Sequence, residues 1–305
     1  MEGIIPLWKP RGLTSHDCVF KLRKILHTKK VGHSGTLDPD VDGVLPICVG
    51  KATKVVEYLQ DSRKVYEGEM VLGFSTETED ASGEVVAVSP VTKALSEDVI
   101  DAMMASFVGE ITQIPPMYSA VKVNGRRLYD YARAGETVER PIRKANIYDF
   151  VRTSTPVYDE QTQTQRWRFR VDCGKGTYVR TLAVDTGKQL GFEAHMSELT
   201  RTESGGFTSI EAVTLEQVAE WMEKEQKEAF LYPLERGISM FKTYHLTEEE
   251  YSILRNGPVL AIDYFDTLTF DEPVALFFNE KIVSIYGVHP TKSGNIKPMK
   301  VFRND

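Results

Sequence analysis

The sequence is poor in cysteine. Three cysteines occur in 305 residues, and they lie far apart at Cys18, Cys48 and Cys173. An odd and dispersed set argues against a disulfide framework and is typical of a reducing compartment, so we expect a cytoplasmic protein. No cysteine belongs to a CxxC pair or lies at metal-ligand spacing from a histidine, and the sequence therefore predicts no zinc site.

Long apolar runs are missing as well. No stretch of about 18 consecutive apolar residues exists, so no membrane-spanning helix is predicted. The N-terminus, MEGIIPLWKPRG, lacks the basic segment followed by a long apolar segment that marks a secretion signal. What remains is an ordinary globular composition, with 41% hydrophobic and 27% charged residues. A chain of 305 residues predicts two domains, or one large domain with an appendage.

An excess of positive charge is also absent, because the formal net charge is −7. That value alone argues against a nucleic-acid partner, but the charges are unevenly distributed. Residues 1–64 carry 11 Lys/Arg against 7 Asp/Glu, residues 65–119 carry 1 against 10, and the tail 281–305 carries 5 against 1. Basic stretches that share one face would form a track for phosphates. Charge alone leaves open the alternative of solvated surfaces without a partner.

Apolar periodicity predicts strands and helices without regular alternation, which indicates an α+β fold. The predicted strands are IIPLW at the N-terminus, VLPICVG, 65–74 and 166–173, and the predicted helices are 15–26, 96–108, 177–191 and 214–229. We expect Ser15 to cap the first helix and Gly191 to end the third. In 65–74, a period of two places Tyr66 on the same face as Met70 and Leu72.

A domain boundary is predicted near 238–245. Beyond it lie a short helical segment, TEEEYSILRNG, and several short apolar runs separated by turns. Short strands in fewer than about 70 residues predict a small β-barrel or sandwich. The sequence thus predicts one domain over residues 1–238 and a second over residues 239–305.

Residues 32–54 form the most informative segment. Pro39 forces Asp38 into an extended conformation, while Gly35 and Gly43 permit tight turns and the close approach of another backbone. A carboxylate on such a rigid loop suits nucleophilic or acid/base chemistry. The alternative is an aspartate that only shapes a turn, which is the usual role of Asp-Pro pairs.

The same segment imitates the start of a calcium-binding loop, because Asp38, Asp40, Asp42 and Gly43 follow the D-x-D-x-D-G pattern. The twelfth loop position should then be a bidentate glutamate, but Val49 occupies it. We therefore expect no calcium site. A metal-dependent hydrolase that uses the three aspartates remains a rival hypothesis, and activity that survives a chelator would count against it.

At this point the motifs become recognisable, because several long segments resemble the TruB-type tRNA pseudouridine-55 synthases. GHSGTLDPDVDGVLPICVGKATK resembles the family's catalytic motif, and WKPRGLTSHDCV resembles its N-terminal Lys-Pro motif. KVYEGEMVLGFSTETEDASG resembles its tyrosine strand and acidic turn, CGKGTYVRTLAVDTG its arginine motif, and SELTRTESGGF its leucine-containing segment. The resemblance implies a mixed, largely antiparallel central sheet flanked by helices, followed by a small β-barrel-like PUA domain that binds RNA.

The resemblance also implies a role for each matching residue. Asp38 matches the essential aspartate, Tyr66 the tyrosine that stacks on the target base, and Arg180 the arginine that pairs with the aspartate. His33 matches a histidine that contacts the flipped-out region of the tRNA loop. The other residues on the substrate side, which support the pocket or join its polar network, are Lys9, Asp80, Tyr178 and Leu199.

The implied reaction detaches uracil from C1′ of its ribose, rotates it and rejoins it through C5, with no cofactor and no metal. Asp38 would either attack C1′ or remove the 2′ proton, and the sequence leaves both routes open. Either route needs an ionised carboxylate, whose pKa is raised by burial and lowered by a guanidinium within about 4–6 Å. The uridine must also be flipped out of its loop, at a cost of a few kcal/mol.

The partner implied by the resemblance is tRNA, which the catalytic domain would contact at the T-arm. The basic tail, with Lys292, Lys297, Lys300 and Arg303, would hold the acceptor side. The expected protein is a monomer without an obligate protein partner or a membrane. Besides the metal-dependent hydrolase, two rivals remain: a non-catalytic RNA-binding protein with the same surface, and a synthase that works inside a guide-RNA complex. The second would need extended basic tails that this chain lacks.

Overall fold

Ten strands form a central sheet in the computed structural model, which describes residues 1–302. Arg303, the last cation of the predicted basic tail, lies outside the described residues. Within residues 1–302 the strand order is β1-β3-β13-β4-β12-β10-β7, and β2, β14 and β11 pair with β3, β13 and β12. The strands are β1 (Gly3–Lys9), β2 (Val31–His33), β3 (Asp42–Val49), β4 (Lys64–Leu72), β7 (Gly109–Gln113), β10 (Arg143–Arg152), β11 (Val157–Asp159), β12 (Thr164–Cys173), β13 (Ala194–Ser204) and β14 (Phe207–Thr208).

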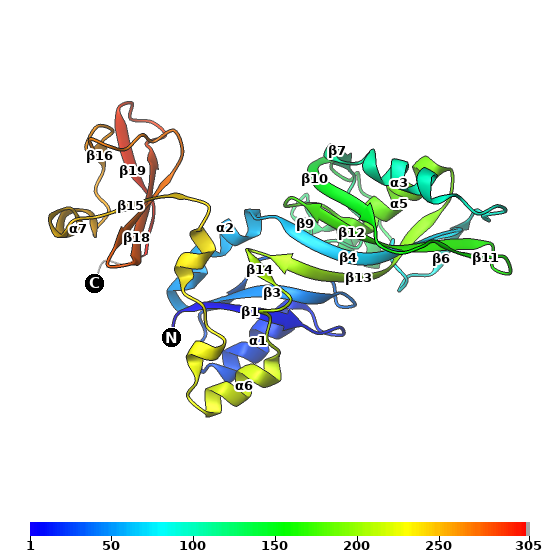
Figure 1. Cartoon of the computed structure of the whole chain (residues 1–305), viewed down its shortest axis with the longest axis horizontal. Coiled ribbons are helices and arrows are strands. Elements are labelled where there is room, and N and C mark those ends of the chain that lie inside the picture. The colour runs from blue at the N-terminus through cyan, green and yellow to red at the C-terminus, as the bar shows by residue number, and fades with distance from the viewer. Residues whose placement is uncertain (303–305) are drawn as a thin grey trace.

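Helices flank this sheet on both of its halves (Figure 1). The helices α1 and α6 pack together near β1 and β3, while α5 packs against β13 and α3 against β10. The α-helices are α1 (Ser15–Ile25), α2 (Val56–Asp61), α3 (Glu97–Ala105), α4 (Leu128–Arg133), α5 (Val179–Leu190), α6 (Leu215–Glu223) and α7 (Glu248–Leu254). Short 3-10 helices cover Gly50–Val55, Lys227–Ala229 and Leu234–Ile238. No helix among residues 1–302 has both the length and the apolar character needed to cross a membrane.

The predicted fold class is confirmed. Neighbouring strands of the central sheet are antiparallel except for β13 and β3, which are parallel. Two small hairpins lie outside it, β5 (Phe74–Thr76) with β6 (Val85–Val88), and β8 (Lys122–Val123) with β9 (Arg126–Arg127). The burial of Tyr66, Met70 and Leu72 on β4 follows the predicted alternation.

Three local predictions were wrong in detail. Thr14, rather than Ser15, caps α1, because its side chain accepts from the backbone N–H of Asp17 in a capping box. The helix predicted over 214–229 ends at Glu223, and a short 3-10 turn follows it. Phe74 does not continue β4, since Gly73 has φ +127° and redirects the chain into β5.

The C-terminal part forms a separate five-stranded sheet in the order β15-β17-β18-β19-β16. Its strands are β15 (Lys242–His245), β16 (Leu260–Ala261), β17 (Val274–Phe278), β18 (Lys281–Val288) and β19 (Asn295–Val301). The two outer strands do not pair with each other, so the predicted barrel-like domain is a curled half-barrel rather than a closed barrel. Figure 1 shows it at one end of the molecule, next to α2.

A continuous apolar cluster joins this half-barrel to the rest of the protein. Ile282, Ile285 and Phe302 pack into one cluster with Val55 and Leu59, which precede β4. Polar contacts surround it: the Lys54 Nζ donates to the Val301 carbonyl at 2.6 Å, the Ile282 N–H donates to the Glu235 Oε1 at 3.1 Å, and Lys300 pairs with Glu57. We call this contact the α2 seam.

Candidate active site

A cleft of about 600 Å³ opens beside β4, at the N-terminus of α5. Its walls come from five segments that are distant in the sequence: the loop after β2, the end of α2 with the start of β4, residues 119–121, the turn that leads into α5, and β13. The sequence-predicted residues that line the cleft are His33, Asp38, Tyr66, Tyr178, Arg180 and Leu199. Two other predicted residues, Lys9 and Asp80, lie outside the lining.

Hydrogen bonds from two buried side chains hold the backbone of the loop that carries Asp38. Lys9 is fully buried at the end of β1, and its Nζ donates to the carbonyls of Leu13 at 2.6 Å, Pro10 at 2.9 Å and Pro39 at 3.2 Å. Ser15 holds the other side, because its hydroxyl accepts from the Leu37 N–H at 2.9 Å. Residues 37 and 39 are thus both tied down, which fixes the backbone on each side of Asp38.

The strand that follows this loop needs a glycine. Gly43 has φ +124°, and a β-carbon there would lie 2.2 Å from the carbonyl oxygen of Arg201 on β13. The parallel pairing of β3 with β13, which sets Gly43 against Arg201, therefore depends on the absence of a side chain. This close approach brings the Asp38 loop next to the strands that carry Tyr66 and Leu199.

Arg180 reaches the cleft from the first turn of α5. The turn is held by Gln113, whose side chain accepts from the Tyr178 N–H at 3.0 Å and donates to the Tyr178 carbonyl at 3.1 Å. The Arg180 guanidinium donates to the carbonyls of Thr78 and Tyr118, each at 2.9 Å. Its Nη2 then lies 3.0 Å from the Asp38 Oδ2, forming an ion pair.

The electrostatics of Asp38 combine opposing effects. Loss of solvent raises the pKa of the Asp38 carboxyl above its ordinary value, the Arg180 charge opposes this, and the Asp80 charge adds to it. The Asp38 side chain is nevertheless 42% exposed, whereas that of Arg180 is 7% exposed. Both observations fit a carboxylate that protein surrounds on most sides and that faces the open cleft.

Asp80 lies behind Arg180 rather than in the cleft. Its Oδ1 accepts from the Thr78 hydroxyl at 2.6 Å and from the Ser82 N–H at 3.0 Å, and its Oδ2 lies 3.7 Å from the Arg180 Nη1. Asp80 is thus an anchored second carboxylate that faces the far side of the same guanidinium. These contacts make Asp80 part of a polar network around Arg180.

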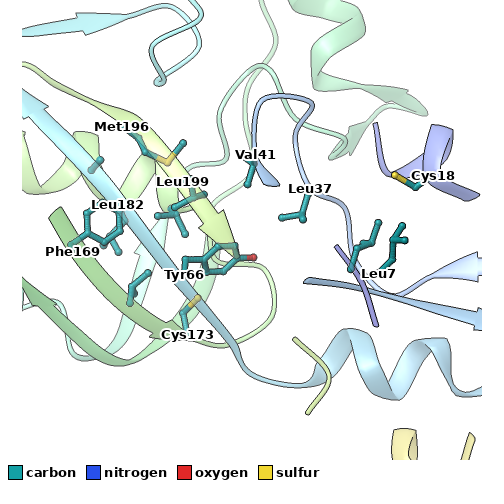
Figure 2. Packing of buried hydrophobic residues seen from close by; sticks show 14 of the residues in the cluster. Leu7, Cys18, Leu37, Val41, Tyr66, Phe169, Cys173, Leu182, Met196 and Leu199 are labelled. Atoms are coloured by element: carbon teal, nitrogen blue, oxygen red, sulfur yellow. The ribbon is translucent and has the colours of Figure 1, made fainter. Parts of the chain in front are cut away.

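Tyr66 forms an aromatic wall of the cleft. Its ring is packed against Leu199 and Cys173, and Figure 2 shows its hydroxyl directed away from Phe169, toward the side of the Asp38 loop that carries Leu37. The residue is 8% exposed, and burial raises the pKa of its phenol while the Arg201 charge opposes the rise. Tyr66 is therefore a neutral, mostly apolar surface with a polar tip.

His33 lies at the end of β2 and faces the cleft. Its Nδ1 accepts from the Gly35 N–H at 3.3 Å, which leaves the proton of a neutral imidazole on Nε2. Burial, and next the Arg201 charge, lower the pKa of His33, so the neutral form is favoured. Tyr178 also lines the cleft, and burial raises the pKa of its phenol.

Three cations that line the cleft, Lys64, Lys175 and Arg201, were not predicted, and two of them are buried. Lys64 begins β4 and Arg201 lies on β13, where it faces Tyr66 as a direct cross-strand neighbour. Both line the cleft, and both are buried, at 7% and 1% exposure. The only signal in the sequence is that each falls near a recognised residue, Lys64 two positions before Tyr66 and Arg201 two positions after Leu199. That spacing on a strand puts the side chains on one face.

Comparisons with known proteins identify the family of the chain. Residues 23–179 match the model of the TruB family pseudouridylate synthase N-terminal domain, and residues 180–239 match that of the tRNA pseudouridylate synthase B C-terminal domain. The chain belongs to the TruB family. It is 56% identical to the tRNA pseudouridine synthase B of Streptococcus gordonii, over 99% of this chain and 100% of that protein. It is 52% identical to the TruB-family protein of the same name from Halalkalibacterium halodurans, over 100% and 99%.

Solved structures share this architecture over nearly the whole chain. A chain from a Cbf5-Nop10-Gar1 complex aligns with a TM-score of 0.73 and 29% identity, over 98% of this chain and 84% of that one. A chain from an H/ACA RNP bound to a substrate RNA that contains 2′-deoxyuridine aligns with a TM-score of 0.72 and 27% identity, over 99% and 86%. The alignment extends through the half-barrel, so both sheets and their order along the chain belong to the shared fold.

Proposed function

We propose that this pseudouridine synthase converts the uridine at position 55, in the T-loop of tRNA, to pseudouridine. The observation that carries the proposal is the ion pair of Asp38 with Arg180 in a cleft walled by Tyr66, within a chain of the TruB family. A cleft of about 600 Å³ has the size of a small-molecule site and can admit one flipped nucleotide.

Asp38 acts on the sugar of the flipped nucleotide. Its carboxylate faces the open cleft, and it either attacks C1′ or removes the 2′ proton, so that the bond between C1′ and N1 breaks. The uracil then rotates and C5 bonds to C1′, which breaks the ester bond to Asp38 in the first route and is followed by return of the 2′ proton in the second. In both routes C5 then loses its proton and N1 gains one, which leaves the isomerised nucleotide and a free Asp38 carboxylate. Arg180 keeps Asp38 ionised by its fixed charge, which opposes the effect of burial on the pKa.

Tyr66 holds the uracil while it is detached. A base–aromatic stack is worth about 1–3 kcal/mol, and walls that exclude water protect the detached intermediates from hydrolysis. Leu199 packs beside Tyr66 and completes the apolar wall. Tyr178 and His33 also line the cleft, and His33 fills the space that the flipped base leaves in the RNA loop.

The remaining predicted residues support these groups from behind. Lys9 fixes the carbonyl of Pro39 next to Asp38, and Asp80 faces Arg180 from the side opposite Asp38. Neither lines the cleft, so both act through the residues they hold rather than on the RNA.

The two parts of the chain divide the work. We propose that residues 1–238 form the catalytic domain and that residues 239–305 form a PUA-like domain that holds the acceptor side of the tRNA. Of the predicted tail cations among residues 1–302, Lys292 and Lys297 are available for this contact, because Lys300 is engaged with Glu57 in the α2 seam. The active species is a cytoplasmic monomer that needs no second protein. Light scattering of the purified enzyme, with and without tRNA, measures its molar mass and so tests the monomeric state.

The deciding experiment incubates unmodified tRNA with the purified protein and maps pseudouridine by base-specific derivatisation. A single new pseudouridine in the T-loop is expected. A tRNA with cytidine at that position is the matched control and should gain none. Binding of tRNA without any isomerisation would instead support the rival hypothesis of a non-catalytic RNA-binding protein.

A further inference from the structure

Two buried cations converge on one empty space in the cleft. Gly35 lines the cleft, and a β-carbon built on it would lie 3.7 Å from the Nη1 of Arg201 and 4.0 Å from the Cε of Lys64. The cations come from neighbouring strands, β13 and β4, while Gly35 belongs to the loop that carries Asp38. The glycine thus leaves this point of the cleft free of a side chain, beside the Arg201 guanidinium and the end of the Lys64 side chain.

Neither cation has an acidic partner among residues 1–302. The Lys64 Nζ donates to the carbonyls of Gln60 at 2.7 Å and Ser62 at 2.6 Å. Arg201 donates from Nε to the Val44 carbonyl at 2.8 Å and from Nη2 to the Gly35 carbonyl at 3.3 Å. All four acceptors are neutral, so the two charges remain uncompensated in this part of the site.

The other cations of the cleft are different. Arg180 faces Asp38 and Asp80, and Lys175 pairs with Asp61 at the protein surface. Burying a cation without an anion is costly, because it loses the solvation that water gave it. Burial, and next the Arg201 charge, lower the pKa of Lys64 to about 8. A bound anion would restore the missing partner and favour the charged form of Lys64.

The position of the space identifies the anion. Gly35 precedes Asp38 by three residues, and Lys64 precedes Tyr66 by two on the same strand. The space therefore lies beside the groups that handle the sugar and the base of the flipped uridine. The negative charge that RNA carries next to a sugar is its phosphodiester, and Lys and Arg side chains are the usual ligands for it.

We propose that Lys64 and Arg201 form an anion subsite over Gly35 that takes a phosphodiester flanking the flipped uridine. This proposal rests on the proposed function, since it assumes a nucleotide in the cleft. Lys64 makes the direct contact, and Arg201, which is less exposed, supports it from behind. The subsite locks the backbone of the everted nucleotide, so that C1′ is held against Asp38.

The test uses T-arm stem-loop RNAs with a single uncharged methylphosphonate linkage, placed either 5′ or 3′ of the target uridine. An all-phosphate RNA and an RNA with the same change in the stem serve as controls. Turnover of the all-phosphate RNA reports on the proposed function, independently of the subsite. For the wild-type enzyme we expect one of the two flanking linkages to lower kcat/KM by about tenfold or more, since a charged hydrogen bond is lost. Full activity on both flanking methylphosphonates would overturn the proposal even if Lys64→Met fails to fold.

The protein side of the test is Lys64→Met, which keeps the length of the side chain but removes the charge. On all-phosphate RNA the variant should have a kcat/KM as low as that of the wild type on the sensitive methylphosphonate RNA. On that methylphosphonate RNA the kcat/KM of the variant should equal that of the wild type. Lys175→Met is the matched control, because Lys175 lines the same cleft but has Asp61 as its partner. Lys175→Met should lower kcat/KM by the same factor on the methylphosphonate RNA as on the all-phosphate RNA. If Lys64→Met also lowers kcat/KM by the same factor on both RNAs, the subsite is refuted.

Discussion

Arg180 is fixed independently of Asp38, although the two side chains meet at 3.0 Å. Two backbone carbonyls hold the guanidinium, which is buried, whereas the carboxylate faces the cleft. The cation therefore stays in place when the carboxylate moves toward a reactant. The Asp38 carboxylate is thus the reactive group and the Arg180 guanidinium is its fixed partner, so substitutions of the two residues should have different effects.

Removing the charge of Asp38 should separate catalysis from folding. We expect Asp38→Asn to lower kcat by more than about 10²-fold, since the amide can neither attack C1′ nor accept a proton. The folded protein raises the pKa of Asp38, so ionisation of this group costs stability above that pKa. The melting temperature of the variant should thus equal or exceed that of the wild type at neutral pH, and the difference should shrink as the pH falls through the pKa. A variant that isomerises uridine at the wild-type rate would refute the mechanism.

Shortening the reach of Arg180 should alter the pH profile. In Arg180→Lys, one ammonium group cannot serve both carbonyls and Asp38 as the planar fork does, and we expect kcat to fall about 10²-fold. Because Arg180 opposes the rise in the pKa of Asp38, the pKa should climb further, and activity needs the ionised form. The acidic limb of kcat/KM should therefore move to higher pH. Arg168→Lys, at an exposed ion pair with Glu198, is the control that should leave this limb in place.

Lys9 should matter for stability although it does not line the cleft. Lys9→Met leaves three backbone carbonyls in the fully buried site without their donor, which should lower the free energy of unfolding by about 2–4 kcal/mol. Urea unfolding of the variant measures this loss. Lys21→Met, on the exposed face of α1, is the control and should change stability by less than about 0.5 kcal/mol. Equal effects of the two substitutions would contradict the anchoring role of Lys9.

The α2 seam should make the half-barrel unfold together with the rest of the chain. Ile285 is fully buried in the seam, and Ile285→Ala should cost about 2–5 kcal/mol and weaken this coupling. Calorimetry should show one transition for the wild type and an earlier, separate transition of the half-barrel in the variant. Val288→Ala, at the exposed end of the same strand, should retain the single transition.

Local patterns sufficed to predict much of this protein. The alternation in 65–74 correctly placed Tyr66 on a buried strand face, and the glycines and proline around Asp38 correctly indicated a loop, which lies between β2 and β3. The motif resemblance then supplied the family and the pairing of Asp38 with Arg180. Local signals failed at the ends of elements: Thr14 and Ser15 are both good caps, and only tertiary structure draws Ser15 to Leu37 instead.

The cationic space over Gly35 could not be read from the sequence. It depends on the parallel register of β3 and β13, which sets Gly43 against Arg201, and on long-range pairing that brings β4 between β13 and β12. Charged residues in strands are usually exposed, so Lys64 and Arg201 gave no reason to expect burial. Register of this kind is decided by contacts between distant segments.

The α2 seam also fixes a distance. The helix that meets the half-barrel through Glu57 leads directly into β4, where Lys64 and Tyr66 begin the wall of the cleft. The seam thus connects the half-barrel, which carries Lys292 and Lys297, to the strand beside Asp38. The distance between these cations and the reactive carboxylate is therefore set by the fold. In the proposed binding mode, an RNA whose stacked arm is one or two base pairs too long or too short would fail to reach both sites at once, so the enzyme would select its substrate by the length of the arm as well as by the loop.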